Sequence, residues 1–268
     1  MTPDLNQFSL EGRVALITGA GRGIGFAFAQ ALARAGAQVI INDLRSETAE
    51  EACHAIQTAG GRAVPAVFDV TDFDGLDAQV DRLVAASGRL DILMNNAGIL
   101  IRAPIEDHGM EEFSRVIDIN LNAVYAMART CARPMKAQGR GRIINTGSVM
   151  SISSRPGVIS YVAAKHGVLG LTRGLAAELG SHNITVNSIG PGYILSEMNR
   201  HVLGTPFEQV VIDRTPMSRW AKPEELTGTA IFLASDAASF VTGQLLMVDG
   251  GMTSNSLLVE SQNLGASS

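Results

Sequence analysis

The 268-residue sequence has few cysteines, few charged residues and no long apolar run. Its two cysteines, Cys53 and Cys131, lie in segments with a helical pattern, and their spacing fits neither a disulfide framework nor a metal knuckle. We therefore expect two buried, reduced thiols. The histidines also lack the spacing of metal ligands, so no metal is expected; they are His54, His108, His166, His182 and His201.

Charge and hydropathy exclude further classes. The net charge is −5 and the basic residues are scattered, which argues against nucleic-acid binding. No apolar run approaches the roughly 18 residues of a membrane span. The segment Met1 to Leu10 lacks a basic start followed by an apolar stretch, so it resembles no secretory leader. A cytoplasmic protein without membrane partners is the expectation.

Short β-branched runs alternate with Ala-rich stretches of helical period, which predicts βαβ units and a parallel sheet. No linker divides the chain. The sequence therefore predicts one domain over residues 1–268, a doubly wound (Rossmann) parallel sheet of about seven strands with helices on both faces. The expected strands are 14–18, 38–42, 63–68, 91–95, 142–145, 185–189 and 245–248, and the expected helices are 24–35, 47–59, 73–87, 122–137, 161–179 and 223–234.

Two stretches break this rhythm. Residues 196–220 show no clear strand or helix pattern and follow the C-terminal end of a strand, where open α/β sheets bind ligands. We expect a substrate lid there. The tail 253–268 is rich in Ser and Asn and has no apolar face, which leaves two alternatives: a flexible segment, or one that docks on a neighbouring subunit.

A glycine-rich turn follows the first strand and leads into a helix. Gly19, Gly23 and Gly25 are spaced G-x-x-x-G-x-G, with Arg22 and Ile24 between them. Glycine lets the backbone turn sharply and approach a phosphate, and the helix N-terminus favours an anion. The turn therefore predicts a pyrophosphate site, although tight helix packing alone would also explain it.

Asp43 comes directly after the second strand, where a carboxylate can accept hydrogen bonds from an adenosine ribose. The same carboxylate repels a 2′-phosphate, and Leu44 adds no positive charge. NAD is thus favoured over NADP. Arg22 argues the other way because a guanidinium can meet a 2′-phosphate, so NADP stays an alternative. A solvated aspartate at a helix start is the structural alternative.

Tyr161 and Lys165 are four residues apart and share one face of a helix. A tyrosine of pKa about 10 is a poor base near neutrality, but a neighbouring ammonium favours its phenolate. Ser148 lies just past a strand end, where its hydroxyl can hold a substrate oxygen while Tyr161 transfers the proton. These three residues predict proton transfer at an alcohol or ketone oxygen.

With the glycine turn, Asn95-Asn96-Ala97-Gly98 and Asn120, the constellation resembles the short-chain dehydrogenase/reductase family over residues 8–252. The resemblance implies an NAD(P)-dependent oxidoreductase that interconverts a secondary alcohol and a ketone. It implies a catalytic tetrad of Asn120, Ser148, Tyr161 and Lys165, in which Asn120 binds a water that relays protons from Lys165. The implied cofactor contacts are Gly19, Arg22, Gly23, Ile24, Gly25, Asp43, Leu44, Asp69, Val70, Asn96, Ala97, Gly98, Tyr161, Lys165, Pro191, Gly192, Ile194 and Ser196. Relatives commonly form homotetramers.

Within that family the sequence is most similar to gluconate 5-dehydrogenases, which implies a sugar-acid or polyol substrate. A cation near the substrate carboxylate is then expected, and Arg102 and Arg155 are the candidates, beside Ser148 and Tyr161. Surface arginines are the alternative reading. Leu100 and the neighbouring Ile101 stand where those relatives are polar, so a reductase of a more apolar ketone is the second hypothesis. A protein that senses NAD without turnover is the third.

Overall fold

The computed structural model describes residues 5–255. Its centre is a seven-stranded sheet in the order β3-β2-β1-β4-β5-β6-β7, in which every neighbouring pair is parallel. The sequence predicted this sheet correctly. The strands are β1 Val14–Ile17, β2 Gln38–Asp43, β3 Arg62–Val67, β4 Ile92–Asn95, β5 Gly141–Thr146, β6 Ile184–Pro191 and β7 Leu245–Val248.

Burial explains why these runs are strands. Every residue of β1, β4 and β6 is buried, as expected for central strands covered by helices on both faces. The edge strand β3 buries only Ala63 and Ala66 and contains Pro65, whose missing N–H is tolerated at an edge.

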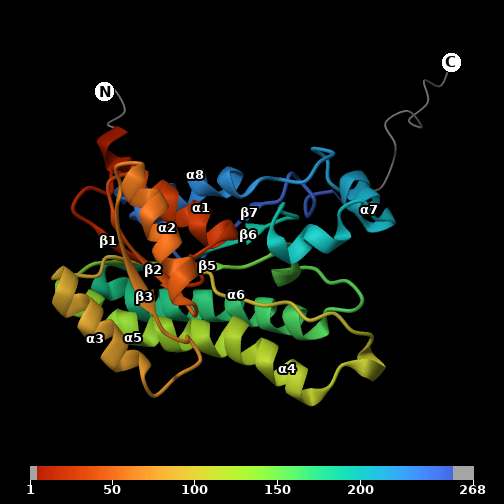
Figure 1. The fold of residues 1–268 in the computed structure, drawn as a ribbon, viewed down its shortest axis with the longest axis horizontal. Coiled ribbons are helices and arrows are strands. Elements are labelled where there is room, and N and C mark those ends of the chain that lie inside the picture. Colours follow the sequence, from red (N-terminus) through yellow and green to blue (C-terminus); the bar gives the residue numbers. More distant parts are fainter. Residues whose placement is uncertain (1–4, 256–268) are drawn as a thin grey trace.

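Helices cover both faces, so the sheet lies between two apolar layers. One layer is formed by α1 (Gly23–Arg34), α2 (Ser46–Thr58) and α8 (Thr227–Ala234), and the other by α3 (Leu76–Ser87), α5 (Ala123–Gln138) and α6 (Ile159–Leu179). In Figure 1, α1 and α8 lie above the strands while α5 and α6 run below them.

Some elements were not predicted. Helix α4 (Met110–Ile117) precedes a π-helical turn, η3 (Asp118–Asn122), and the segment expected to be a lid contains η6 (Glu197–Val202) and α7 (Pro206–Arg214). Most of the proposed tail, 256–268, lies outside the described residues. The remaining short turns are η1 Leu5–Phe8, η2 Ile105–Asp107, η4 Val149–Ser151, η5 Gly180–His182, η7 Pro223–Leu226 and η8 Asp236–Ala238.

An ionic network ties the N-terminal edge of the sheet together. Arg142 on β5 is almost fully buried, and its guanidinium donates to Asp236 at 3.4 Å and to the carbonyl of Ser235 at 3.3 Å. Arg140 and Arg13 also bind the Asp236 carboxylate. Asp236 thereby joins η8 to the starts of β1 and β5.

Over residues 5–255 no helix has the length and apolar character needed to cross a membrane. The same part of the chain contains no group of three or more metal-ligating side chains.

Candidate active site

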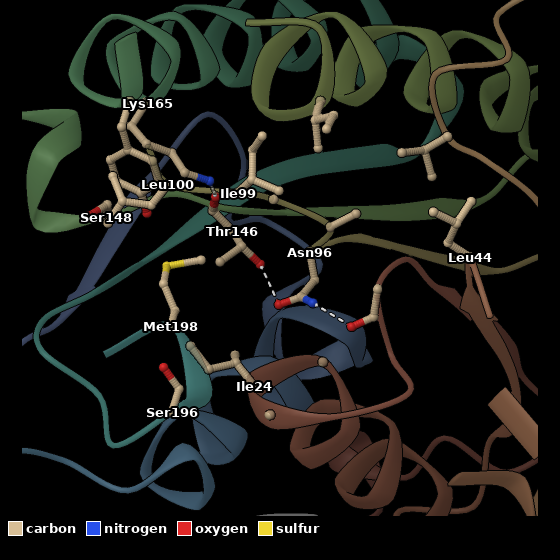
Figure 2. Close-up of a pocket in the computed structure, with 18 of the residues that line it drawn as sticks. Ile24, Leu44, Asn96, Ile99, Leu100, Thr146, Ser148, Lys165, Ser196 and Met198 are labelled. Carbon is tan, nitrogen blue, oxygen red and sulfur yellow. Dashed lines mark hydrogen bonds between the residues drawn. The ribbon is translucent and has the colours of Figure 1, made fainter. Parts of the chain in front are cut away.

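A large cavity of about 1170 Å³ opens along the C-terminal edge of the sheet. It lies where β1 pairs with β4, the point at which the strand order reverses, and such switch points are where doubly wound sheets bind ligands. Figure 2 shows Leu44 at one end of the cavity and Ser148 with Lys165 at the other. The cavity is lined by residues that follow strands on both sides of the β1–β4 junction.

The glycine turn between β1 and α1 is shaped for close approach. Gly19 and Gly23 have φ of +60° and +59°, a backbone region that other residues rarely adopt. A Cβ on Gly25 would lie 2.3 Å from the carbonyl oxygen of Gly19. Helix α1 begins at Gly23 with no side-chain cap, so its first N–H groups are available to a ligand. The cradle fits a pyrophosphate.

Side-chain hydrogen bonds join this turn to the end of β4. The Thr18 hydroxyl accepts from the N–H groups of Asn96 (2.9 Å) and Ala97 (3.1 Å). The Asn96 amide donates to the carbonyls of Thr18 and Gly19, both at 3.1 Å. These bonds hold the end of β4 against the glycine turn, and Figure 2 shows the Asn96 side chain also bonded to Thr146.

At the other end of the cavity Asp43 is the last residue of β2. One carboxylate oxygen accepts from the Arg45 N–H at 3.1 Å, and a Cβ on Gly21 would lie 2.6 Å from the other oxygen. The glycine turn thus passes directly over the carboxylate. Arg22 points elsewhere, because its guanidinium pairs at 3.9 Å with Glu197 of η6.

Tyr161 and Lys165 project from the first turns of α6 into the cavity, and Ser148 faces them from the end of β5. The Tyr161 hydroxyl lies near Ser148, which acts against the rise in the Tyr161 pKa that burial causes. The ammonium of Lys165 lies 5.5 Å from the centroid of the Tyr161 ring and donates to the carbonyl of Thr146 at 2.6 Å. Ser148 also caps η4, where its hydroxyl accepts from the Met150 N–H at 3.1 Å. Tyr161, Lys165 and Ser148, which the sequence analysis grouped together, therefore lie side by side in the cavity.

Burial controls the charge of these groups. It lowers the pKa of Lys165 from 10.5 to about 8. Burial also raises the pKa of Tyr161 above its usual value of 10, although the hydrogen bond from Ser148 and the positive charges of Arg102 and Arg155 act in the opposite direction. At neutral pH the site therefore holds a protonated tyrosine beside an ammonium.

Asn120 is fully buried in the π-helical turn η3 between α4 and α5. Its amide pairs with the backbone of Ile99, accepting from the N–H and donating to the carbonyl, each at 2.8 Å. It therefore lies behind the cavity wall and does not line the cavity. Turns of this type inside α-helices are frequent at functional sites.

A smaller pocket of about 60 Å³ adjoins Ser148 and Tyr161. Arg155 lines it, with its guanidinium 5.1 Å from the centroid of the Phe207 ring. Partial burial lowers the pKa of Arg102, and the nearby charge of Arg155 lowers it further. The Arg102 guanidinium donates to the Asn199 side chain at 3.4 Å. Neither guanidinium forms an ion pair with any residue in the range 5–255.

The large cavity is lined by every residue assigned to the cofactor from sequence. Arg102 lies near the substrate pocket but lines neither cavity; its side chain is largely exposed, and the part that neighbouring residues cover lowers its pKa. Sequence reasoning missed Thr146, which holds Lys165, and also Met198 and Asn199, which reach both pockets from η6. Thr146 could have been found from its position two residues before Ser148. No sequence signal pointed to Met198 or Asn199.

Known proteins resemble this chain over most of its length. A family model described as Enoyl-(Acyl carrier protein) reductase matches residues 19–253. A gluconate 5-dehydrogenase of Gluconobacter oxydans (strain 621H) is 45% identical over 252 residues, or 94% of this chain and 98% of the relative. A 5-keto-D-gluconate 5-reductase of Escherichia coli (strain K12) is 43% identical over 246 residues, or 91% and 97%.

Among solved structures, a gluconate 5-dehydrogenase from Burkholderia cenocepacia J2315 in complex with NADP and tartrate has a TM-score of 0.91 and 43% sequence identity. The alignment covers 94% of this chain and 99% of that one. The similarity therefore includes the whole sheet and both ends of the cavity.

Proposed function

This chain belongs to the short-chain dehydrogenase/reductase family and is an NAD(P)-dependent oxidoreductase that interconverts alcohols and ketones. We propose that its substrate is a sugar acid, oxidised or reduced at a secondary alcohol or ketone carbon. The observation that carries this proposal is the pair Arg102 and Arg155, two guanidiniums without an ionic partner beside Tyr161. The named activities of the similar enzymes support it.

The cofactor would lie along the large cavity. The glycine turn and the start of α1 hold the pyrophosphate, because their N–H groups face an anion without interference from side chains. Asp43 would accept hydrogen bonds from the ribose hydroxyls, and Leu44, Asp69 and Val70, which line the same end of the cavity, would contact the adenosine. The segment Pro191 to Ser196 lines the cavity where the nicotinamide would lie, and that ring would supply or accept the hydride.

Tyr161 is the proton donor for ketone reduction and the acceptor for alcohol oxidation. Ser148 holds the substrate oxygen through its hydroxyl, which lies beside Tyr161 in the pocket. The ammonium of Lys165 favours the phenolate that forms when Tyr161 gives up its proton. Burial keeps solvent from competing for these groups.

Asn120 is the fourth member of the proposed tetrad and lies beneath the residues that line the cavity. By locking the backbone of Ile99 it fixes the loop that follows β4, and it thereby orders the cavity near Lys165. In the proposed relay a water bound in this region passes protons between Lys165 and solvent.

The substrate carboxylate would bind the two arginines. A charge-assisted contact between guanidinium and carboxylate is about twice as strong as a neutral hydrogen bond. The lowered pKa of Arg102, caused by burial and then by the charge of Arg155, indicates that an anion placed between them would relieve their repulsion. Asn199 holds Arg102 on that side of the pocket.

We further propose that residues 1–268 form one domain, with 196–220 as the substrate lid. Glu197 and Asn199 of η6 reach Arg22 and Arg102, so this segment contacts both the phosphate turn and the substrate side. A homotetramer in the cytoplasm is the assembly and location we propose from the family resemblance.

A substrate panel with matched variants tests the sugar-acid proposal. Arg155→Ala and Arg102→Ala should each raise KM for D-gluconate by about tenfold or more, because a charge-assisted contact is lost. The KM for cyclopentanol, a neutral secondary alcohol, should stay nearly unchanged. Arg82→Ala, on the exposed surface of α3, is the control for loss of an arginine. Equal effects on both substrates would remove the sugar-acid assignment.

A second candidate is reduction of a more apolar ketone. The small pocket contains Leu100, Val149, Met150, Val158 and Met198 beside its polar residues, and these apolar walls favour a hydrocarbon group. The same panel separates the two, because wild type would then prefer cyclopentanone or a larger neutral ketone to 5-keto-D-gluconate in kcat/KM.

A further inference from the structure

The substrate pocket contains a second tyrosine, Tyr193, that the mechanism above does not use. It follows the end of β6 and lines the small pocket together with Ser148, Tyr161 and Arg155. It is partly buried. A phenol in this place faces the same ligand as the catalytic groups.

The ring of Tyr193 is fixed by two aromatic neighbours. Its centroid lies 5.2 Å from that of Trp220 and 5.8 Å from that of Phe207, and both contacts are edge-on. Trp220 is only 6% exposed, and Phe207 belongs to α7. Edge-to-face contacts stabilise one ring orientation, so the direction of the Tyr193 hydroxyl is set before a substrate enters.

The hydroxyl of Tyr193 is held beside a cation. It lies near Arg155, whose positive charge acts against the rise in its pKa, and the Arg155 guanidinium lies 5.1 Å from the centroid of the Phe207 ring, which also contacts the Tyr193 ring. Burial raises the pKa of Tyr193, and the nearby charges of Arg155 and Arg102 oppose that effect only in part. The phenol is therefore neutral at physiological pH, and its oxygen can accept a hydrogen bond as well as donate one.

This pairing differs from a simple carboxylate site. A guanidinium only donates hydrogen bonds, so Arg155 recognises an anion, whereas the neutral hydroxyl next to it recognises a group that also donates. A ligand that satisfies both carries a carboxylate and a hydroxyl on neighbouring carbons. If Tyr193 served only for packing against Phe207 and Trp220, a phenylalanine would suffice.

We propose that Tyr193 is a specificity-determining residue whose hydroxyl contacts a substrate hydroxyl next to the carboxylate held by Arg155. The proposal rests on the sugar-acid function and narrows it to polyhydroxy acids, as against acids that carry a single reacting alcohol. Tyr161 remains the proton-transfer group, and Tyr193 selects which alcohol is presented to it.

Tyr193→Phe tests the proposal because it keeps both ring contacts and removes one hydroxyl. We expect KM for D-gluconate to rise by about five- to tenfold, the effect of one lost hydrogen bond in a partly buried site, with kcat changed by less than about threefold. The dissociation constant of D-gluconate from the complex with NADH, which cannot turn over, should rise by the same factor. KM for NAD and the thermal midpoint should not move.

Tyr125→Phe on α5, where the side chain is 49% exposed, is the matched control and should change none of these values. A Tyr193→Phe enzyme with unchanged KM and dissociation constant for D-gluconate would overturn the role of Tyr193 while leaving the sugar-acid function intact. A lowered thermal midpoint and a raised KM for NAD would show a structural role and overturn it as well. A wild type that neither binds nor oxidises D-gluconate would overturn the proposed function itself.

Discussion

At the scale of single residues, the Tyr161 hydroxyl is the group on which turnover depends most. Tyr161→Phe should lower kcat by at least about a hundredfold, the usual contribution of a positioned acid or base. NAD binding, measured by fluorescence titration, should change little because the ring still packs over Lys165. Tyr125→Phe serves as the control. Near-normal turnover would show that another group transfers the proton.

Residue types and spacings predicted the reacting groups but not the residues that hold them. Residues four apart lie on the same face of an α-helix, so the proximity of Tyr161 and Lys165 could be predicted from their spacing. The partner of Lys165 is a backbone carbonyl, that of Thr146, and every residue has one. Tyr193 likewise acquires its role only from Phe207 and Trp220, which are distant in sequence.

At the scale of elements, the end of β2 and the glycine turn together determine cofactor preference. Wild type should prefer NAD, because Asp43 repels a 2′-phosphate and Arg22 is engaged by Glu197 of η6. Asp43→Ser should lower the ratio of kcat/KM for NAD to kcat/KM for NADP by about tenfold or more.

The control for that experiment is Glu51→Ser, an exposed carboxylate on α2 away from the cavity. A wild type that prefers NADP would contradict the role assigned to Asp43. A ratio that Asp43→Ser leaves untouched would do so equally, and would direct attention to Arg22.

Long, well-covered elements were predictable and short ones were not. All seven strands and α1, α2, α5 and α6 appear within a few residues of the expected ranges, because their apolar periodicity extends over whole elements. Helices α4 and α7 are only 8 and 9 residues long and each buries a single residue, Val116 and Val211, so any helical pattern extends over little more than two turns. For this reason the sequence analysis predicted no helix in residues 196–220.

At the scale of the whole molecule, the network around Asp236 holds the N-terminal edge of the sheet. Burial alone would raise the pKa of Asp236, but the hydrogen bond from Arg140 and the charges of Arg140, Arg13 and Arg142 lower it below its usual value of 3.8. A carboxyl whose folded pKa is lowered stabilises the fold above that value, and the contribution disappears as pH falls through the folded pKa.

Asp236→Asn should therefore lower the free energy of unfolding by about 1–2 kcal/mol at pH 7, a value kept small because the carboxylate is partly exposed. The deficit should shrink when pH falls below about 4. Urea unfolding at a fixed protein concentration measures both. Asp74→Asn, an exposed residue before α3, is the control. A deficit that persists unchanged at acid pH would show that charge is not its cause.

The strand order also determines how the protein resists unfolding. The ladder between β1 and β4 has three paired positions, fewer than any other in the sheet, and it joins the half that carries Asp43 to the half that carries Lys165. A dinucleotide in the cavity contacts both halves, so its binding free energy is lost in every state in which they have separated. Cofactor binding therefore opposes separation of the two halves in particular, while fraying of the edge strand β7, which does not line the cavity, proceeds as it does without cofactor.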